Sequence, residues 1–407
     1  MEKFIARQPI FTNTLETYGY ELLFRSSKKN TYTGEDGVIS TSQVLSSTFS
    51  LFDIEELING KKAFINFPEE LLLNKSPSLF PKNLLVVEIL EDVEPSEDIV
   101  KVVRELKEEG YIIALDDFIY KLKYIPLIKI ADIIKIDFFI TKGEARGAVL
   151  DEISTINKNI KFLAEKVETQ EEFEEAKKFG YSFFQGYFFA KPHIVSKKDI
   201  PGYKITYMRI LDEVNKEDIG FDRIENILKT DVSLSYKFLK YINSAFFSFS
   251  NEIRSIRQAL TLLGVEGIKK WITITLLGSL GDDKPQELIV LSVFRAKFCE
   301  NLGAFIGFNK EKREELFLLG LFSLIDAILG RPKAEIFESI SLEHEIKEAL
   351  TGKNSIFSDI LNLVIAYEEV NEEKLTFYSE KLKMPEKKVE ELYWESLKWT
   401  GKIFIQN

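Results

Sequence analysis

The sequence has 407 residues, which is too long for one ordinary hydrophobic core and predicts two or three domains. Its hydrophobic content of 45% and charged content of 29% are typical of a globular protein. The net charge of −11 argues against a large nucleic-acid-binding face, because such faces are normally basic.

Cysteine and histidine are too scarce for most metal and nucleophile chemistry. The single Cys299 excludes an intrachain disulfide and a multi-cysteine zinc site, and its helical surroundings predict a buried, inert thiol. Only two histidines occur, His193 and His344. Any bound metal is therefore expected to be a hard cation held by carboxylates, such as Mg²⁺ or Mn²⁺.

No segment indicates a membrane or export. The N-terminus lacks a basic segment followed by an apolar one, and no apolar run reaches the ~18 residues that cross a bilayer. The apolar stretch Trp271–Leu280 is short and predicts a buried helix. We therefore expect a cytoplasmic protein.

The first half alternates short apolar runs with amphipathic stretches. In Ser96–Glu109, apolar residues recur at the spacing of one helix face, and Gly110 then ends the helix. Repeated strand–helix units predict a mainly parallel sheet, and eight strands predict a (β/α)8-like barrel. The runs expected to be strands are Phe4–Phe11, Tyr18–Phe24, Ala63–Phe67, Leu84–Leu90, Tyr111–Leu115, Ile133–Ile136, Lys161–Ala164 and Tyr181–Phe184.

The second half has helical periodicity throughout. Leu234, Phe238, Leu239 and Ile242 form one apolar face, and several glycines separate the segments. Prolines, a glycine and lysines between the two halves predict a linker. We therefore expect a barrel domain at residues 1–195, a linker at 196–204 and an all-α domain at 205–407.

Polar residues interrupt or close the strand runs of the first half. In a parallel barrel the functional residues lie at the carboxyl ends of the strands, so these side chains are expected to meet in one pocket. Converging acids need a cation, which indicates a one- or two-metal site for phosphoryl chemistry. A network of interior ion pairs is the competing interpretation, because unpaired buried charge is costly. The residues are Glu21, Asn66, Glu88, Asp116, Asp117, Lys135 and Glu165.

These residues stand in motifs that resemble a known family. Glu21-Leu22-Leu23-Phe24-Arg25 is similar to the Glu-Ala-Leu-Leu-Arg signature of EAL-type cyclic di-GMP phosphodiesterases, with Leu22 in place of Ala. Further motifs follow in the family's order over about 190 residues, close to the size of a compact barrel domain. They are Phe64-Ile65-Asn66-Phe67, Glu88-Ile89-Leu90-Glu91, Asp116-Asp117-Phe118, Lys135-Ile136-Asp137, Ala164-Glu165-Lys166-Val167-Glu168-Thr169 and Gln185-Gly186-Tyr187.

The resemblance implies a role for each matched residue. Glu21, Asn66, Glu88 and Asp116 would be metal ligands, and Asp117 would bridge to a second ion. Glu165 would be a metal-linked base and Lys135 would help to activate the attacking water. Arg25 and Gln185 would contact the nucleotide. The family cleaves cyclic di-GMP to the linear dinucleotide pGpG, which fits two-metal activation of water.

One segment departs from the family. Active EAL enzymes carry a small, glycine-, threonine- or serine-rich loop after Asp-Asp-Phe, whereas this chain has Ile119-Tyr120-Lys121-Leu122-Lys123-Tyr124. Glu91, which would support that loop in the family, lacks its usual partner. EAL relatives often form dimers through this loop, so the resemblance leaves a monomer and a homodimer open.

The helical half resembles the HDOD domain, a relative of HD phosphohydrolases. The resemblance rests on Asn243-Ser244-Ala245, Ser255-Ile256, Ala259–Gly264 and Gly320–Asp326. Phe322 and Ser323 stand where an HD enzyme would carry His-Asp, which excludes a working HD metal site. Asn243 and Ser244 are expected to cap or cross-link helices. HDOD domains are regulatory or protein-binding modules, so the resemblance implies an unidentified protein partner.

Two functions stay open at this point. The chain is either a signalling protein whose divergent EAL domain binds metal, cyclic di-GMP or both without useful turnover, or an active metal-dependent phosphodiesterase. The altered loop and the non-catalytic helical half favour the first, and the full set of acids with Lys135 favours the second.

Overall fold

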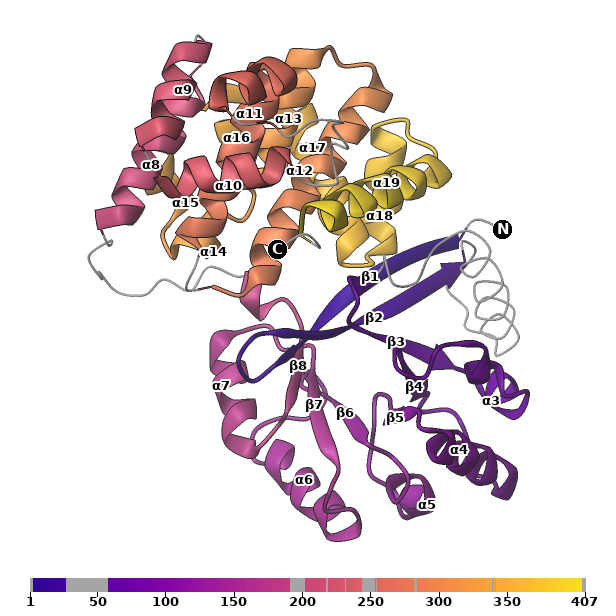
Figure 1. The fold of residues 1–407 in the computed structure, drawn as a ribbon. Coiled ribbons are helices and arrows are strands. Elements are labelled where there is room, and N and C mark those ends of the chain that lie inside the picture. Colours follow the sequence, from indigo (N-terminus) through magenta and orange to yellow (C-terminus); the bar gives the residue numbers. More distant parts are fainter. Residues whose placement is uncertain are drawn as a thin grey trace. The chain divides into compact units, whose positions relative to one another are not determined.

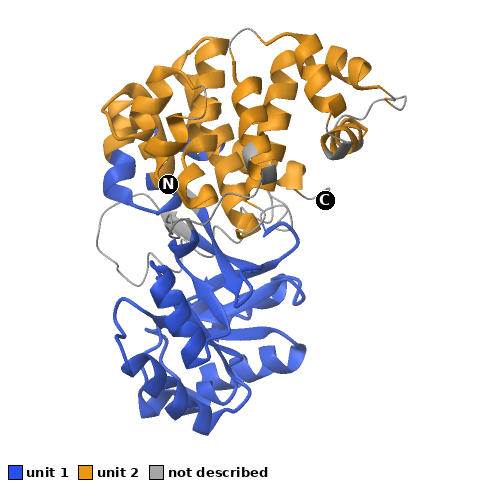
Figure 2. Ribbon diagram, turned by 90° about the vertical axis from the view of Figure 1, so that its left-hand side faces the viewer, with its two compact units in different colours: residues 1–191, 366–376, 385–391 blue, residues 192–365, 377–384, 392–407 orange. Residues whose placement is uncertain are grey.

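The computed structural model describes residues 3–26, 58–190, 202–216, 219–230, 232–243, 253, 255–281, 284–338, 340 and 342–404. The chain divides into two compact units, coloured separately in Figure 2. The first comprises residues 1–191, 366–376 and 385–391, and the second comprises residues 192–365, 377–384 and 392–407. Most of the expected linker, and His193, lie outside the described residues.

The first unit is built on a barrel of eight strands that closes in chain order (Figure 1). Every expected strand is present, which confirms the (β/α)8-like fold. The strands are β1 (Lys3–Thr12), β2 (Thr17–Ser26), β3 (Lys62–Phe67), β4 (Leu85–Ile89), β5 (Ile112–Leu115), β6 (Ile133–Asp137), β7 (Lys161–Glu165) and β8 (Phe183–Gln185).

Strand β1 departs from the parallel arrangement. It runs antiparallel to both β2 and β8, whereas all the other neighbouring pairs are parallel. The reason is the short connection to β2, in which Leu15 N donates to Thr12 O at 3.0 Å and Leu15 has a φ of 62°. So tight a turn joins only antiparallel strands, because a parallel connection needs a crossover of a dozen or more residues.

Helices surround the strands of the barrel (Figure 1). The helix expected over Ser96–Glu109 is α4, which begins after the Ser96 cap and ends at Gly110 with a φ of 100°. Its buried residues Ile99, Val102, Val103 and Leu106 are the predicted apolar face. The helices of this part of the chain are α3 (Glu69–Leu73), α4 (Glu97–Glu109), α5 (Ile125–Ile128), α6 (Ala145–Ile156) and α7 (Gln170–Phe179), with 3₁₀ turns η1 (Ser76–Leu79), η2 (Leu122–Tyr124) and η3 (Phe188–Ala190).

An apolar layer fills the barrel. It takes one inward-facing residue from each of seven strands, and all seven are buried. Such layers are what makes a small barrel a packed core rather than a pore. Its members are Ile10, Phe64, Val86, Ala114, Ile133, Leu163 and Phe183.

The regular elements of the described residues from Gly202 onward are all helices, as expected. No strand lies between Gly202 and Phe404 among the residues that the structure describes. The helices are α8 (Gly202–Val214), α9 (Phe221–Thr230), α10 (Val232–Ile242), α11 (Ile256–Leu280), α12 (Gln286–Ile306), α13 (Lys310–Phe322), α14 (Ile325–Leu329), α15 (Lys333–Glu338), α16 (His344–Leu350), α17 (Ile356–Glu368), α18 (Glu372–Lys381) and α19 (Glu386–Phe404).

The core of the second unit uses the predicted apolar faces. Phe238 on α10 is fully buried, and its ring centroid lies 4.9 Å from that of Trp271 on α11. Cys299 is buried, as expected. The amide of Asn243 cross-links backbone groups: it donates to Ile253 O and accepts from Ile253 N, both at 2.7 Å. This confirms the structural role expected of Asn243, whereas Ser244 lies outside the described residues.

Within the described ranges, no helix is both long enough and apolar enough to cross a bilayer. The stretch Trp271–Leu280 forms the C-terminal end of α11 and contributes several fully buried side chains to the core, as predicted from its length.

An ion pair between α11 and α12 makes a testable contribution to stability. Burial raises the pKa of Glu300, but Lys270 and Lys297 lower it more, so the net shift is downward. A depressed carboxyl pKa stabilises the fold above the unfolded-state value and loses that effect as the pH falls. Glu300→Gln is expected to lower the free energy of unfolding at pH 7 by about 1.5–3 kcal/mol.

The difference between Glu300→Gln and the wild type should narrow as the pH falls below the ordinary glutamate value of 4.5. Urea unfolding at pH 7 and at acid pH measures both effects. The exposed Glu395→Gln is the control and should match the wild type throughout. A Glu300→Gln deficit that is the same at both pH values would contradict the assignment.

Candidate functional site

A polar layer lies directly above the apolar layer of the barrel. Side chains on a strand alternate between its two faces, so a residue two positions further along faces the interior again. In six strands that next inward position is polar. The steps are Phe64 to Asn66, Val86 to Glu88, Ala114 to Asp116, Ile133 to Lys135, Leu163 to Glu165 and Phe183 to Gln185.

The reversed strand β1 contributes to the same layer in the opposite chain direction. Gln8 lies two residues before Ile10, and it pairs in register with Glu21 of β2. Sequence reasoning missed Gln8, because it placed site residues after apolar residues. The only signal for Gln8 was a polar residue within an apolar run, which becomes informative once the strand direction is known.

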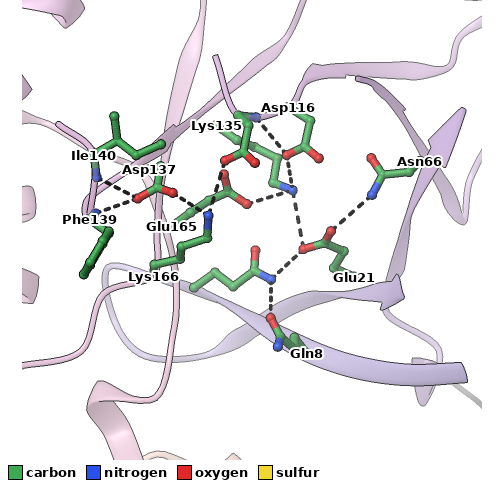
Figure 3. Close-up of polar contacts among 12 residues, drawn as sticks. Gln8, Glu21, Asn66, Asp116, Lys135, Asp137, Phe139, Ile140, Glu165 and Lys166 are labelled. Carbon is green, nitrogen blue, oxygen red and sulfur yellow. Dashed lines mark hydrogen bonds and ion pairs between the residues drawn. The ribbon is translucent and has the colours of Figure 1, made fainter. Parts of the chain in front are cut away.

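Lys135 is the centre of this polar layer. Its side chain is fully buried, and its Nζ lies 2.6 Å from Asp116 Oδ1, 2.8 Å from Glu88 Oε1 and 2.9 Å from Glu165 Oε1. A fourth carboxylate, that of Glu21, is 3.4 Å away. Figure 3 shows Glu21, Asp116 and Glu165 converging on the ammonium from separate strands. The predicted acids therefore do meet in one place.

The charges of this cluster do not balance if all its members ionise, because one ammonium faces four carboxylates. Burial raises the pKa of Glu88 well above its usual range, and Glu21 and Asp116 add to the effect against Lys135. Burial likewise raises the pKa of Glu165. Burial alone would lower the pKa of Lys135, but Asp116, Glu165, Glu21 and Glu88 raise it well above the ordinary value. The ammonium is therefore held charged, while some of the carboxyls favour their protonated form.

Amide side chains hold Glu21 in place. Gln185 Nε2 donates to Glu21 Oε2 at 2.6 Å and to Gln8 Oε1 at 3.1 Å. Asn66 Nδ2 donates to Glu21 Oε1 at 3.3 Å. Gln185 and Asn66 are thus in the cluster, as predicted. The side chain of Arg25, the other predicted nucleotide contact, lies outside the described residues.

A second, more exposed group of charges lies at the rim. Lys166 Nζ forms an ion pair with Asp137 and lies 3.6 Å from Asp117 Oδ1. Asp137 Oδ1 also accepts from the backbone amides of Phe139 and Ile140. Asp117 and Lys166 have φ angles of 38° and 54°, which non-glycine residues rarely adopt and which occur preferentially at functional sites. Asp117 is therefore near the cluster but turned toward the rim.

A glycine closes the wall beside Gln185. Gly186 has a φ of 144°, and a Cβ there would lie 2.1 Å from Val167 O. Only glycine allows this approach, in which Val167 N donates to Gln185 O at 3.0 Å. The segments that follow β7 and β8 are thereby joined, which fixes Gln185 next to Glu165 and Lys166.

The oxygen atoms of the cluster suit a hard cation in their chemistry. Glu88 Oε2, Glu165 Oε2 and Asn66 Oδ1 are buried and accept no hydrogen bond. Carboxylate and amide oxygens of this kind are the ligands that Mg²⁺ and Ca²⁺ prefer. In the present arrangement, however, no three acidic, histidine or cysteine side chains among the described residues are spaced as ligands of one ion. The carboxylates are instead turned toward Lys135, which is the arrangement that the competing interpretation, a network of interior ion pairs, predicts.

Breaking this network should be costly. Lys135→Met keeps most of the length of the side chain but leaves four buried carboxylates without their cation. Removing one member of a buried ion pair typically costs 3–5 kcal/mol, so we expect the free energy of unfolding to fall by about that amount at pH 7. Chemical denaturation measures it, with the exposed Lys129→Met as a control that should change by less than about 0.5 kcal/mol. Equal stability of the two variants would contradict the central role of Lys135.

Phe322 and Ser323 stand where the resemblance places the His-Asp pair of HD enzymes, and neither is a metal ligand of that kind. Phe322 ends α13, and Ser323 follows it; both are buried. Ser323 Oγ donates to Gly320 O at 2.7 Å and accepts from Arg295 Nη1 at 3.3 Å. The position of the His-Asp pair of HD enzymes is therefore filled by an aromatic ring and a hydrogen-bonded hydroxyl.

Comparison with known proteins gives two family matches that cover separate parts of the chain. The model of the EAL domain matches residues 52–192, and the model of the HDOD domain matches residues 200–330. The EAL match begins after Glu21, so the first two strands lie outside it.

Two relatives align over nearly the whole chain. The protein YuxH of Bacillus subtilis is 36% identical over 98% of both chains. The cyclic di-GMP phosphodiesterase CdgJ of Vibrio cholerae is 33% identical over 90% of this chain and 85% of its own. Among solved structures, a standalone EAL protein of Vibrio cholerae with bound c-di-GMP is 26% identical, with a TM-score of 0.37, over 47% of this chain and 92% of its own.

Proposed function

The chain belongs to the family of proteins that join an EAL domain to an HDOD domain, and we propose that its barrel binds cyclic di-GMP together with a divalent cation. The observation that supports this proposal is the buried cluster of carboxylates around Lys135 at the carboxyl ends of the strands. The relative CdgJ, which is named for this nucleotide, aligns over most of the chain.

The charge of the cluster supports a requirement for the cation. Cyclic di-GMP carries two anionic phosphodiesters, and they would approach four carboxylates that a single ammonium only partly offsets. A bound cation changes the sign of such a site. We infer Mg²⁺ or Mn²⁺, held by Glu21, Asn66, Glu88 and Asp116 with Asp117 at a second position. The ion would compete with the Lys135 ammonium for the same oxygens.

Calorimetric titration tests the binding proposal. Cyclic di-GMP is expected to bind in the presence of Mg²⁺ or Mn²⁺ and to lose most of its affinity in EDTA. Glu21→Gln should weaken binding by at least tenfold, because it removes a charge that the cation needs. Glu16→Gln is the matched control: Glu16 is exposed and lies in the turn before the same strand, so its loss should leave the affinity unchanged. Equal binding by both variants would contradict the proposed site.

Hydrolysis of the bound nucleotide is the second candidate function. The specific observation in its favour is Glu165, whose pKa burial raises well above the ordinary value. That raised pKa favours the protonated acid, so Glu165 would act as a base once the charge of Lys135 or of a bound cation lowers its pKa. Its Oε1 also lies 2.9 Å from Lys135 Nζ, which would help to orient the attacking water.

Each residue would have a defined part in that reaction. Glu165 would take a proton from water as the water oxygen forms a bond to phosphorus. The bond from phosphorus to one ester oxygen would break, and that oxygen would take a proton from solvent to give linear pGpG. Divalent cations, when bound, lower the pKa of the water and stabilise the charge on the phosphoryl oxygens. Gln185 and Arg25 would hold the nucleotide.

One variant distinguishes the hydrolysis proposal from the binding proposal. Glu165→Gln should lower the rate of pGpG formation by at least a hundredfold while cyclic di-GMP still binds, since a positioned base typically contributes 10²–10⁴-fold. Chromatography of the nucleotides after incubation with Mn²⁺ measures the rate. Glu171→Gln, an exposed change on α7, is the control. If the wild-type protein binds the nucleotide but forms no pGpG, the result would contradict hydrolysis and would be consistent with the binding function alone.

We infer a regulatory, protein-binding role for the helical domain. The absence of a His-Asp pair at Phe322 and Ser323 supports a non-catalytic domain. The domain would pass the nucleotide-bound state of the barrel to a protein partner, which is either a different chain or a second copy of this one.

A further inference from the structure

Hydrogen bonds hold the Asp116–Asp117 pair and the segment that follows it against the neighbouring strands. Asp116 N donates to Ile89 O at 2.9 Å, and Phe118 N donates to Lys135 O at 3.0 Å. The acidic pair is thus tied to β4 on one side and to the strand of Lys135 on the other. Phe118 is buried, and its ring meets that of Tyr124 edge-on at 5.7 Å.

Tyr124 fastens this segment to the loop after β4. Its hydroxyl donates to Glu91 O at 2.9 Å, and its side chain is 9% exposed. The neighbouring Lys123 Nζ lies 2.5 Å from Glu94 Oε1, but both of those side chains are exposed. Exposed ion pairs contribute little, so the part-buried hydrogen bond of the Tyr124 hydroxyl is the stronger of the two attachments.

Side-chain packing does not fully surround the Asp116–Asp117 pair on the side that faces the loop after β4. A pocket of about 90 Å³ lies between the loops that follow β4 and β5. Its lining includes Glu91, Asp116, Asp117, Phe118 and Tyr124. Asp117 also has a φ of 38°, a conformation that persists only when its surroundings determine it. With open space beside it, the backbone of the pair depends on its hydrogen bonds.

We propose that Tyr124 is a positioning residue for the cation site. Through its hydroxyl and the ring of Phe118, it holds the loop after β5 against the loop after β4, and so keeps Asp116 and Asp117 in register with Glu88. The inference rests on the proposed function, because it assigns to Tyr124 the support of ligands that the cation would use.

The barrel contains a matched control for this role. Tyr111 is also buried, and its hydroxyl donates to a backbone carbonyl, that of Phe80, at 2.8 Å. It lies just before β5, at the end of the strand opposite to the acidic pair. Tyr111→Phe and Tyr124→Phe therefore each remove one hydrogen bond from a hydroxyl to a backbone carbonyl, and they should lower the midpoint of urea unfolding by similar amounts.

Hydrogen exchange of the metal-free protein tests directly whether Tyr124 holds the loop after β5 in place. Tyr124→Phe is expected to speed the exchange of backbone amides in residues 116–124 relative to the wild type. Tyr111→Phe should leave that segment unchanged. Exchange in residues 116–124 that is the same in both variants would overturn the proposal, whatever the nucleotide chemistry of the protein.

Mn²⁺ affinity tests the consequence for the site. Free Mn²⁺, followed by electron paramagnetic resonance, should show about tenfold weaker binding to Tyr124→Phe, since outer-shell partners typically contribute 10–100-fold to metal affinity. Tyr111→Phe should bind Mn²⁺ as the wild type does, although its stability falls by a similar amount. A loss shared by both variants would show a general structural effect and overturn the positioning role.

The two proposals fail in different ways. Wild-type protein that binds neither Mn²⁺ nor cyclic di-GMP would contradict the proposed function, and the positioning role with it. Wild-type protein that binds both, with Tyr124→Phe indistinguishable from Tyr111→Phe in exchange and in Mn²⁺ affinity, would overturn the role of Tyr124 alone.

Discussion

Side chains alternate between the two faces of a β-strand, and this period of two residues places the whole candidate site. One inward-facing layer of the barrel is apolar, and the next layer toward the carboxyl ends is polar. Because six strands contribute at the same step, their polar residues form a single cluster with Glu21 of β2 and Gln8 of β1. The reversed direction of β1 follows the same rule, which is why Gln8 precedes its apolar partner Ile10 rather than following it.

The polar layer lies inside a closed barrel, so its charges must be offset by one another or by a ligand. The Lys135 ammonium offsets part of the negative charge of four carboxylates. The raised pKa values of Glu88 and Glu165 reduce the remaining charge, because they favour the protonated carboxyls. If the proposed function holds, the ion-pair network and the cation site would be two states of the same oxygens. A cation and the Lys135 ammonium would exchange places as partners of these acids.

Much of this arrangement could be predicted from the sequence, because apolar runs bounded by polar residues locate all eight strands and their ends. Glu21, Asn66, Glu88, Asp116, Lys135, Glu165 and Gln185 meet as expected. The direction of β1 depends on a turn of a few residues, so Gln8 was not found. Lys166 and Tyr124 were missed because their contacts cross between loops, where no periodicity relates one residue to another.

An anomalous-scattering crystal structure with Mn²⁺ and cyclic di-GMP tests the central claim most directly. The account predicts a manganese peak among Glu21, Asn66, Glu88 and Asp116, with the Lys135 ammonium withdrawn from at least one of the four carboxylates that it now contacts. The contrary result is a nucleotide-bound structure with no manganese in this layer and all four Lys135 contacts intact. The polar layer would then be a structural ion-pair network.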